Sequence, residues 1–368
     1  MDKEMQFDYE KVNYDLIIIG AGPAGYPAAF KAAEKGKKVA IIEKAAVGGV
    51  CLNSGCIPTK TLLHSSGILR KSKCTAGVSV TDVVIDMKAL QNRREEVILQ
   101  LQKGILSQIK KYKIDLFYAT AQVVAADSVL IHLNDSDEIA TLHASHILVT
   151  GGSFPAILPV PGFENPGIMT SSTLLKKQTL YKNLIIVGGG VIGVEFAEFY
   201  SDLGISVTII EAAPHILPQM DIDIARNLTA ILKKRGVTIL CGAMVQKAVK
   251  DTDTQYTVFY SNSLDESTVS SISAEGVLCA TGRKCNAENL FSEDFVSNIK
   301  ISKGMISIDK NCETTVKGIY AAGDITGGLQ LAHKATAEGL CAIQTIFSDS
   351  NDTCYHLKKH NPPRSIAS

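Results

Sequence analysis

Two stretches of the sequence repeat one pattern and decide the fold. Residues 14–25 read YDLIIIGAGPAG, and residues 183–193 read NLIIVGGGVIG. Each is an apolar run that predicts a buried strand, followed by GxGxxG and then by an apolar helical pattern. In each copy an acidic residue, Glu43 or Glu211, lies 23 positions after the first glycine. Such a turn presents helix N–H groups to a pyrophosphate, and the acidic residue can accept hydrogen bonds from a ribose.

The repeat predicts an α/β protein with two Rossmann-like dinucleotide-binding domains, the second inserted in the first. Two such sites imply two dinucleotides, one kept as a redox cofactor and one exchanged. A Pro-rich link at 155–167 marks the change of domain, and VLCATGR at 277–283 mirrors ILVTGGS at 147–153. We therefore expect a first domain at 1–151 and 281–349, a second domain at 152–280, and a tail at 350–368.

The overall composition narrows the class of protein. The 368 residues carry 37 Lys plus Arg and 37 Asp plus Glu, which argues against general binding to nucleic acid or to anionic membranes. No apolar run reaches the roughly 20 residues that span a bilayer, and the acidic amino terminus does not resemble a secretory signal. Nine cysteines form no disulfide framework of the secreted kind. We expect a cytoplasmic protein whose partners are small molecules or other proteins.

The segment GGVCLNSGCIPTK, residues 48–60, carries Cys51 and Cys56. In a regular helix their Cα atoms would be roughly 8 to 9 Å apart, too far for a disulfide. The turn formers at 53–55 predict an interruption, with a new helix beginning just after Cys56. A cysteine at the amino end of a helix has a stabilised thiolate. The pair is therefore interpreted as a redox dithiol, and the alternative is two buried cysteines without redox chemistry.

The sequence as a whole resembles the pyridine nucleotide–disulfide oxidoreductases. GAGPAGY, the cysteine motif, GGGVIGVE, ATGRKCN, GIYAAGD and LAHKATAEG occur in the order found in that family. The residues Leu-Asn and Ile-Pro-Thr-Lys make the cysteine motif most similar to that of the dihydrolipoamide dehydrogenases. The resemblance implies FAD on the first repeat, NAD on the second, and oxidation of protein-bound dihydrolipoamide through Cys51 and Cys56 with reduction of NAD to NADH.

The resemblance also assigns expected roles to individual residues. The catalytic group would be Cys51, Cys56, Lys60 and Glu195, with Lys60 near the flavin and paired with Glu195. The FAD site would include Gly20, Gly22, Gly25, Glu43, Gly49, Lys60, Asp324, Ala332 and His333. The NAD site would include Gly188, Gly190, Val191, Ile192, Gly193, Glu211 and Gly282. No Lys or Arg closely follows Glu211, which favours NAD over NADP.

The implied partner is a lipoyl-bearing protein of a 2-oxoacid dehydrogenase or glycine cleavage complex, and full-length members of the family form homodimers. The family supplies its acid/base histidine from a motif worded HPTxSE, which this sequence lacks. We therefore expect a truncated form that binds FAD and accepts electrons from NADH but oxidises dihydrolipoamide poorly. The alternatives are an NADH-dependent reductase of another disulfide or electron acceptor, and a non-catalytic flavin-binding remnant.

Smaller departures from the family pattern are TGGS at 150–153 in place of ATGS, and Cys285 in place of Pro. The family also has a carboxy-terminal domain that forms most of the homodimer interface, and the resemblance implies that residues 355–368 are its first strand, cut short. The tail also contains Cys354, His356 and His360, whose spacing is compatible with a metal site. The favoured interpretation is that these side chains lie in a solvated tail and bind no metal.

Overall fold

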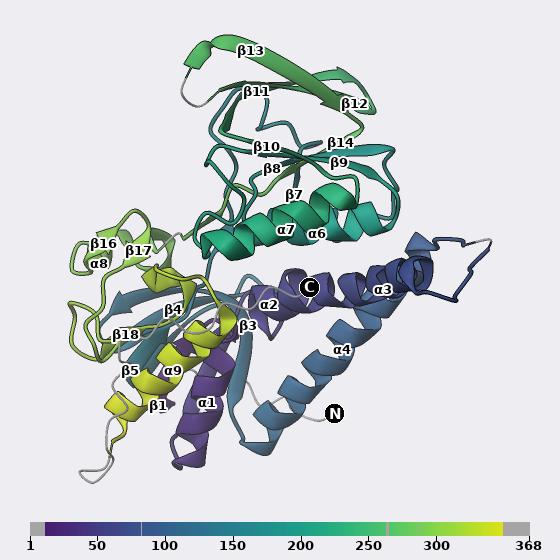
Figure 1. The fold of residues 1–368 in the computed structure, drawn as a ribbon. Helices are drawn as coiled ribbons and strands as arrows, with labels where there is room; N and C mark the ends of the chain where they lie inside the picture. Colours follow the sequence, from purple (N-terminus) through teal and green to yellow (C-terminus); the bar gives the residue numbers. More distant parts are fainter. Residues whose placement is uncertain (1–11, 82, 263–264, 286, 349–368) are drawn as a thin grey trace. The chain divides into compact units, whose positions relative to one another are not determined.

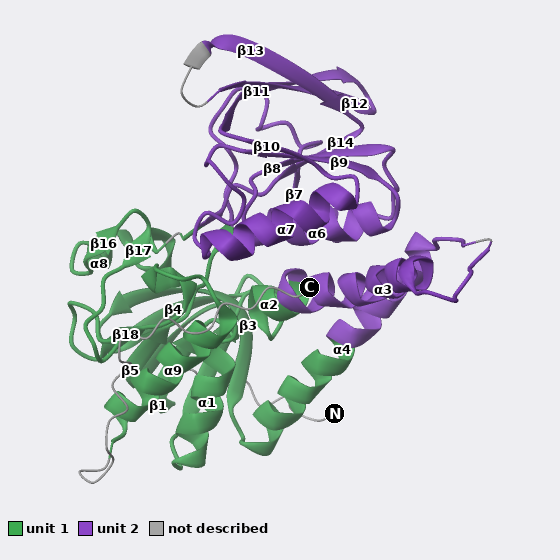
Figure 2. Cartoon of the chain, in the orientation of Figure 1, with its two compact units in different colours: residues 1–53, 99–154, 284–363 green, residues 54–98, 155–283, 364–368 purple. Residues whose placement is uncertain are grey.

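The computed structural model describes residues 12–81, 83–262, 265–285 and 287–348 (Figure 1). The chain forms two compact units, residues 1–53, 99–154 and 284–363 in unit 1, and residues 54–98, 155–283 and 364–368 in unit 2 (Figure 2). Unit 1 is built from segments on both sides of 155–283, so the predicted α/β fold with one domain inserted in the other is confirmed. Residues 54–98 group with unit 2 by their contacts, although the sequence division placed them in the first domain. The division by bound cofactor stays a prediction.

Unit 1 contains a parallel layer in the order β3-β2-β1-β5-β18. The long strands β3 and β5 also pair antiparallel with β4, so each strand takes part in two pairings along its length. The core strands are apolar on both faces, as expected for buried parallel strands. The elements are β1 Asn13–Ile19, α1 Gly25–Glu34, β2 Val39–Glu43, β3 Asp115–Ala125, β4 Ser128–Leu133, β5 Ile139–Val149, η2 Glu288–Leu290, α8 Glu293–Val296, β16 Ile301–Ser302, β17 Met305–Ile306, β18 Ile319–Ala321, η3 Asp324–Thr326 and α9 Ala332–Ile346.

Unit 2 repeats the same design. Its five-stranded sheet has the order β10-β9-β8-β14-β7, with every neighbouring pair parallel. A three-stranded antiparallel meander, β11-β12-β13, shares a second apolar cluster with that sheet. The elements are α3 Cys56–Cys74, β7 Met169–Thr170, α5 Ser171–Leu174, β8 Asn183–Val187, α6 Val191–Asp202, β9 Ser206–Glu211, α7 Ile222–Lys234, β10 Thr238–Cys241, β11 Ala243–Thr252, β12 Gln255–Asn262, β13 Asp265–Ala274 and β14 Gly276–Cys279.

Four elements contain residues of both units. They are α2 Gly49–Ser54, α4 Met87–Lys111, β6 Phe154–Pro155 and β15 Arg283–Lys284. The helical periodicity of the sequence at 87–111 predicts a long helix there, and α4 has the same bounds.

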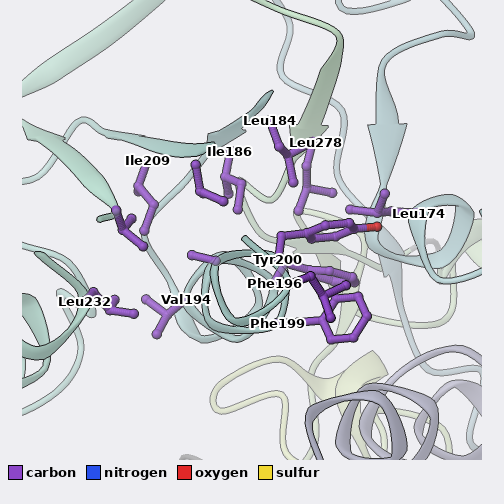
Figure 3. Close-up of a cluster of buried hydrophobic side chains, with 14 of the residues drawn as sticks. Leu174, Leu184, Ile186, Val194, Phe196, Phe199, Tyr200, Ile209, Leu232 and Leu278 are labelled. Carbon is purple, nitrogen blue, oxygen red and sulfur yellow. The ribbon is translucent and has the colours of Figure 1, made fainter. Parts of the chain in front are cut away.

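Helix α6 is the centre of the main apolar core of unit 2. Its side chains Val194, Phe196, Phe199 and Tyr200 lie against side chains from the strands of the sheet and from α5 and α7 (Figure 3). The ring of Tyr200 contacts that of Phe199 edge to face, with centroids 5.0 Å apart. Burying large aromatic side chains in this way dominates the energetics of a core, so the position of α6 on the sheet is firmly set.

No helix in the described part of the chain is both long enough and apolar enough to cross a membrane.

Candidate functional site

The first glycine turn joins β1 to α1 and is closed by Glu43 at the end of β2. Both carboxylate oxygens of Glu43 accept backbone N–H groups, Oε2 from Ala21 at 2.8 Å and Oε1 from Ala45 at 2.9 Å. Gly20 has φ 106°, a conformation that favours glycine. A Cβ at Gly25 would overlap the carbonyl oxygen of Gly20, so α1 can approach the turn only with glycine there. Each oxygen of Glu43 keeps a lone pair that a ribose hydroxyl can use.

The second glycine turn, between β8 and α6, has the same glutamate hydrogen bonds and the same glycine geometry as the first. Glu211 accepts from Gly189 N at 2.6 Å through Oε2 and from Ala213 N at 2.7 Å through Oε1. Gly188 has the same φ of 106° as its counterpart, and a Cβ at Gly193 would overlap the carbonyl oxygen of Gly188. Val191 and Ile192 are the first residues of α6, so their N–H groups lie at its amino end.

The middle glycine of each turn leaves open space beside its backbone. A Cβ built at Gly190 meets no protein atom within 4 Å, and one built at Gly22 meets only the Cα of Gly49, at 3.7 Å. The contact also shows that Gly49, at the start of α2, lies beside the first turn, as the FAD-site expectation requires. Because these glycines are not needed for packing within the protein, close approach of a ligand is the physical reason for them. The residues present therefore fit a dinucleotide at each turn, and which turn holds FAD stays a prediction.

The strand ends at 147–153 and 277–283 run beside the two turns, as their similarity predicted. Thr150 N donates to Ile19 O at 2.9 Å, and Ala280 N donates to Val187 O at 2.7 Å. The structure also accounts for TGGS in place of ATGS. The Thr150 hydroxyl donates to the Ile19 carbonyl at 2.9 Å, and Leu290 occupies the space that a side chain at Gly151 would need. Gly282, expected near NAD, follows this strand with φ 121° and an open Cβ direction.

The two cysteines of the motif lie on two consecutive helices, a short one and a long one, with the interruption that the sequence predicted. Cys51 lies in α2, which ends at Ser54, and Cys56 is the first residue of α3. Gly55 between them has φ −140° and ψ −113°, outside the helical region. Asn53 stabilises this arrangement because its amide donates to the carbonyl of Gly49 at 2.9 Å. Both cysteines are partly exposed.

Lys60 lies one turn into α3 and pairs with Glu195 on α6. The Nζ to Oε1 distance is 2.7 Å, and the Glu195 side chain is 8% exposed whereas that of Lys60 is 44% exposed. A buried carboxylate requires a partner, so the pair fixes the ammonium group close to the cysteine end of α3. The structure thus contains the pairing implied by the family resemblance.

Farther along α3, a charged cluster that the sequence analysis missed fastens the same two helices together. Arg70 lies 3.6 Å from Glu198 and 3.4 Å from Asp202 on α6, and Arg235 lies 2.9 Å from Glu198. Ser66 donates to Asp202 Oδ2 at 3.1 Å. Burial raises the pKa of Asp202, while Arg70, the Ser66 hydroxyl and Arg235 oppose that increase.

One signal in the sequence could have revealed this cluster. Glu195, Glu198 and Asp202 follow one another at helical spacing in an otherwise apolar helix. Acidic side chains in a buried helix need cationic partners.

Asp324, expected at the FAD site, lies in the loop 321–328 of unit 1, which is held from several sides. Its carboxylate accepts from the Ser153 hydroxyl, and its carbonyl accepts from the Cys285 thiol at 3.0 Å. Cys285, where the family usually has Pro, thus contributes a hydrogen bond of its own. The carboxylate of Glu338 on α9 accepts from Gly323 N at 2.8 Å and from the Thr326 hydroxyl at 3.2 Å. Ala332 and His333 are the first two residues of α9, which follows the loop.

The expectations for the tail, with Cys354, His356 and His360, lie outside the described residues.

Each glycine turn is held by a glutamate that accepts two backbone N–H groups, and Cys56 of the cysteine pair is the first residue of a helix. Together these features define a nucleotide-dependent redox protein. The chain belongs to the pyridine nucleotide-disulphide oxidoreductase family, whose pattern matches residues 14–339. Membership implies an enzyme that uses FAD and a nicotinamide nucleotide.

Known relatives agree with this membership. The chain is similar to the dihydrolipoyl dehydrogenase of Bacillus subtilis (strain 168), with 35% identity over 342 residues that cover 90% of this chain and 71% of the relative. It is 37% identical over 341 residues to the dihydrolipoyl dehydrogenase of Acholeplasma laidlawii, covering 91% of this chain and 96% of that one. Among solved structures it is similar to the Cu(II) complex of the HOCl-induced flavoprotein disulfide reductase RclA from Escherichia coli, with TM-score 0.79, 31% identity, and coverage of 92% of this chain and 72% of that one.

Proposed function

We propose that the chain is a flavoprotein dihydrolipoyl dehydrogenase, which oxidises protein-bound dihydrolipoamide through Cys51 and Cys56 and reduces NAD. The observation that carries the proposal is Cys56 as the first residue of α3, with the Lys60–Glu195 ion pair one turn further along. This arrangement suits a redox dithiol better than two cysteines that only fill space, because a packing role needs neither a helix start nor a fixed ammonium group.

The cysteines would act by thiol–disulfide exchange. In the oxidised enzyme a substrate thiolate attacks Sγ of Cys51, a bond forms between these sulfurs, and the Cys51–Cys56 bond breaks. Cys56 leaves as a thiolate, which the amino end of α3 stabilises. The second substrate sulfur then displaces Cys51 and releases the cyclic disulfide. Lys60 adds positive charge near this end of the helix, and Glu195 holds it there.

The nucleotide sites would be divided between the units. The first turn, with Glu43, would hold the pyrophosphate and ribose of FAD, and Asp324 would face its ribityl chain. The second turn, with Glu211, would hold NAD, since a carboxylate accepts from a free 2′-hydroxyl and repels a 2′-phosphate. When bound, the two cofactors supply the two-electron and hydride chemistry.

The partner proposed for this activity is a lipoyl-bearing protein of a 2-oxoacid dehydrogenase or glycine cleavage complex, with the full-length enzyme a homodimer. The second candidate is an NADH-dependent reductase of another disulfide or electron acceptor. It is favoured by the similarity to the flavoprotein disulfide reductase RclA.

An anaerobic titration of the FAD-loaded protein with NADH, followed by visible absorption, tests the proposal. We expect bleaching of the flavin and growth of a long-wavelength band from a Cys56 thiolate next to it. Cys56→Ser should abolish that band, whereas Cys74→Ser, at an exposed cysteine at the far end of α3, should keep it. Because the sequence lacks the HPTxSE motif, dihydrolipoamide and NAD should then give NADH only slowly.

The possible outcomes separate the candidates. A band together with reduction of another disulfide by NADH that is faster than the oxidation of dihydrolipoamide would favour the second candidate. A protein that binds FAD but shows no band would favour a non-catalytic flavin-binding remnant.

A further inference from the structure

The cysteine motif is hydrogen-bonded to helix α4 through Asn53. Asn53 is the residue before the last of α2, the short helix that carries Cys51. The side chain of Gln102 on α4 donates from Nε2 to Asn53 Oδ1 at 2.6 Å. Both residues are partly buried, and both belong to unit 1. A helix that is distant in the sequence thus contacts the segment between the two cysteines of the motif.

The direction of this bond follows from the surroundings of Asn53. Its Nδ2 lies 2.9 Å from the carbonyl oxygen of Gly49, 3.1 Å from that of Val47 and 3.2 Å from that of Ala46. Because a carbonyl oxygen only accepts, the amide nitrogen with its two protons must face these groups, and Oδ1 must face Gln102. Gln102 therefore has to present its own amide nitrogen. A side chain without a donor at 102 would leave Asn53 Oδ1 unsatisfied.

Helix α2 is held at both of its ends. At the start, the Gly48 N–H donates to the carbonyl of Ala21, in the first glycine turn, at 2.8 Å. At the far end, the Asn53 amide bonds back to the segment before the helix and accepts from Gln102. Cys51 lies between these two attachments, so its backbone is restrained from both sides.

We propose that Gln102 is a positioning residue for the redox dithiol: it holds Asn53 and thereby keeps Cys51 in place while the Cys51–Cys56 bond is open. A closed disulfide restrains Cys51 covalently, whereas in the open dithiol noncovalent contacts provide the restraint. A sulfur that is already in place loses less conformational entropy when the bond closes again, so closure is favoured. The inference rests on the proposed function, because it needs Cys51 and Cys56 to act as a dithiol.

Equilibration with dithiothreitol measures this effect. The two thiols of the reagent reduce the Cys51–Cys56 disulfide to two thiols and become a cyclic disulfide, so that two electrons and two protons pass to the protein. The FAD-loaded full chain is incubated anaerobically with mixtures of reduced and oxidised dithiothreitol, quenched with acid, alkylated and digested. The fraction of peptide with both cysteines alkylated gives the equilibrium constant. We expect Gln102→Met, which removes the donor, to favour the open dithiol about fivefold, the equivalent of one ordinary hydrogen bond.

Two further variants serve as controls. Gln100→Met is the matched control, because Gln100 is an exposed glutamine on the same helix, and its equilibrium should equal that of the wild type. Gln102→Glu keeps the shape of the side chain but turns an acceptor toward Asn53 Oδ1, so it should favour the open dithiol at least as strongly as Gln102→Met. It also provides the test if Gln102→Met does not fold.

Each outcome decides for or against the inference. Equilibria of Gln102→Met and Gln102→Glu that both equal that of the wild type overturn it and leave the proposed function standing. An equal shift in Gln100→Met also overturns it, because the effect would then come from α4 in general. If the wild type forms no Cys51–Cys56 bond in any mixture, the inference and the proposed function fail together.

Discussion

Replacing Arg70 with Ala should show how strongly the charged cluster fastens α3 to α6. Arg70 is 27% exposed and lies within 3.6 Å of two carboxylates that are 8% and 2% exposed. Removing one partner of a fully buried pair costs roughly 3–5 kcal/mol. Because Arg235 remains beside Glu198 and Arg70 is partly in water, we expect a loss of about 2 kcal/mol in the free energy of unfolding, measured by urea titration at saturating FAD.

The pH dependence of that loss follows from Asp202. Its pKa is already raised by burial, and losing Arg70 raises it further. Between the ordinary aspartate pKa and this raised value, the folded variant binds more protons than the unfolded chain, so its stability falls as pH rises. The difference between variant and wild type should therefore be larger at pH 8 than at pH 5.

Arg93→Ala is the matched control for this prediction. Arg93 forms a 3.6 Å pair with Glu96 in which both side chains are about two-thirds exposed, and its loss should not be measurable. If Arg70→Ala behaves like Arg93→Ala, or if its cost is the same at both pH values, the cluster does not fasten the helices in the way described.

Four further substitutions address the nucleotide turns and the Asp324 loop. Gly193→Ala should lower the melting temperature because its Cβ overlaps the Gly188 carbonyl, whereas Gly190→Ala should leave the melting temperature unchanged and weaken NADH binding. Scanning calorimetry measures the first quantity and titration calorimetry the second. The same behaviour of both variants in both measurements would contradict this prediction. Thr150→Val should cost about 1 kcal/mol in a urea titration, since the hydroxyl bond to the Ile19 carbonyl is lost; an unchanged midpoint would argue against that bond. Glu338→Gln should increase the FAD lost on gel filtration, because Gly323 exchanges a charged acceptor for a neutral one; retention equal to wild type would contradict it.

The elements closest to the glycine turns could be predicted from sequence because their signals are local. GxGxxG after an apolar run, an acidic residue at fixed distance and turn formers between two cysteines each specify backbone geometry within a few residues. The start of α3 at Cys56 agrees with what the turn formers predict, and the bounds of α4 agree with the helical periodicity of 87–111.

What the sequence analysis missed depends on contacts between distant segments. Arg70 and Asp202, for example, meet only after the sheet has formed, and no short motif marks either residue of the pair. The grouping of 54–98 with unit 2 has the same origin, because it follows from the packing of α3 on α6 rather than from chain order.

Helix α6 has no side that faces water. Nine of its twelve residues are buried and none is exposed: one end closes the second dinucleotide turn, one face lies on the sheet, and another carries the acids that hold α3. A systematic substitution of every position should find few tolerated changes anywhere along this helix, whereas α7, with only two buried residues, should accept many. Among random variants that still fold, we therefore expect few with changes in α6. Attempts to change the nucleotide preference of the protein should begin on β9, the strand that ends at Glu211.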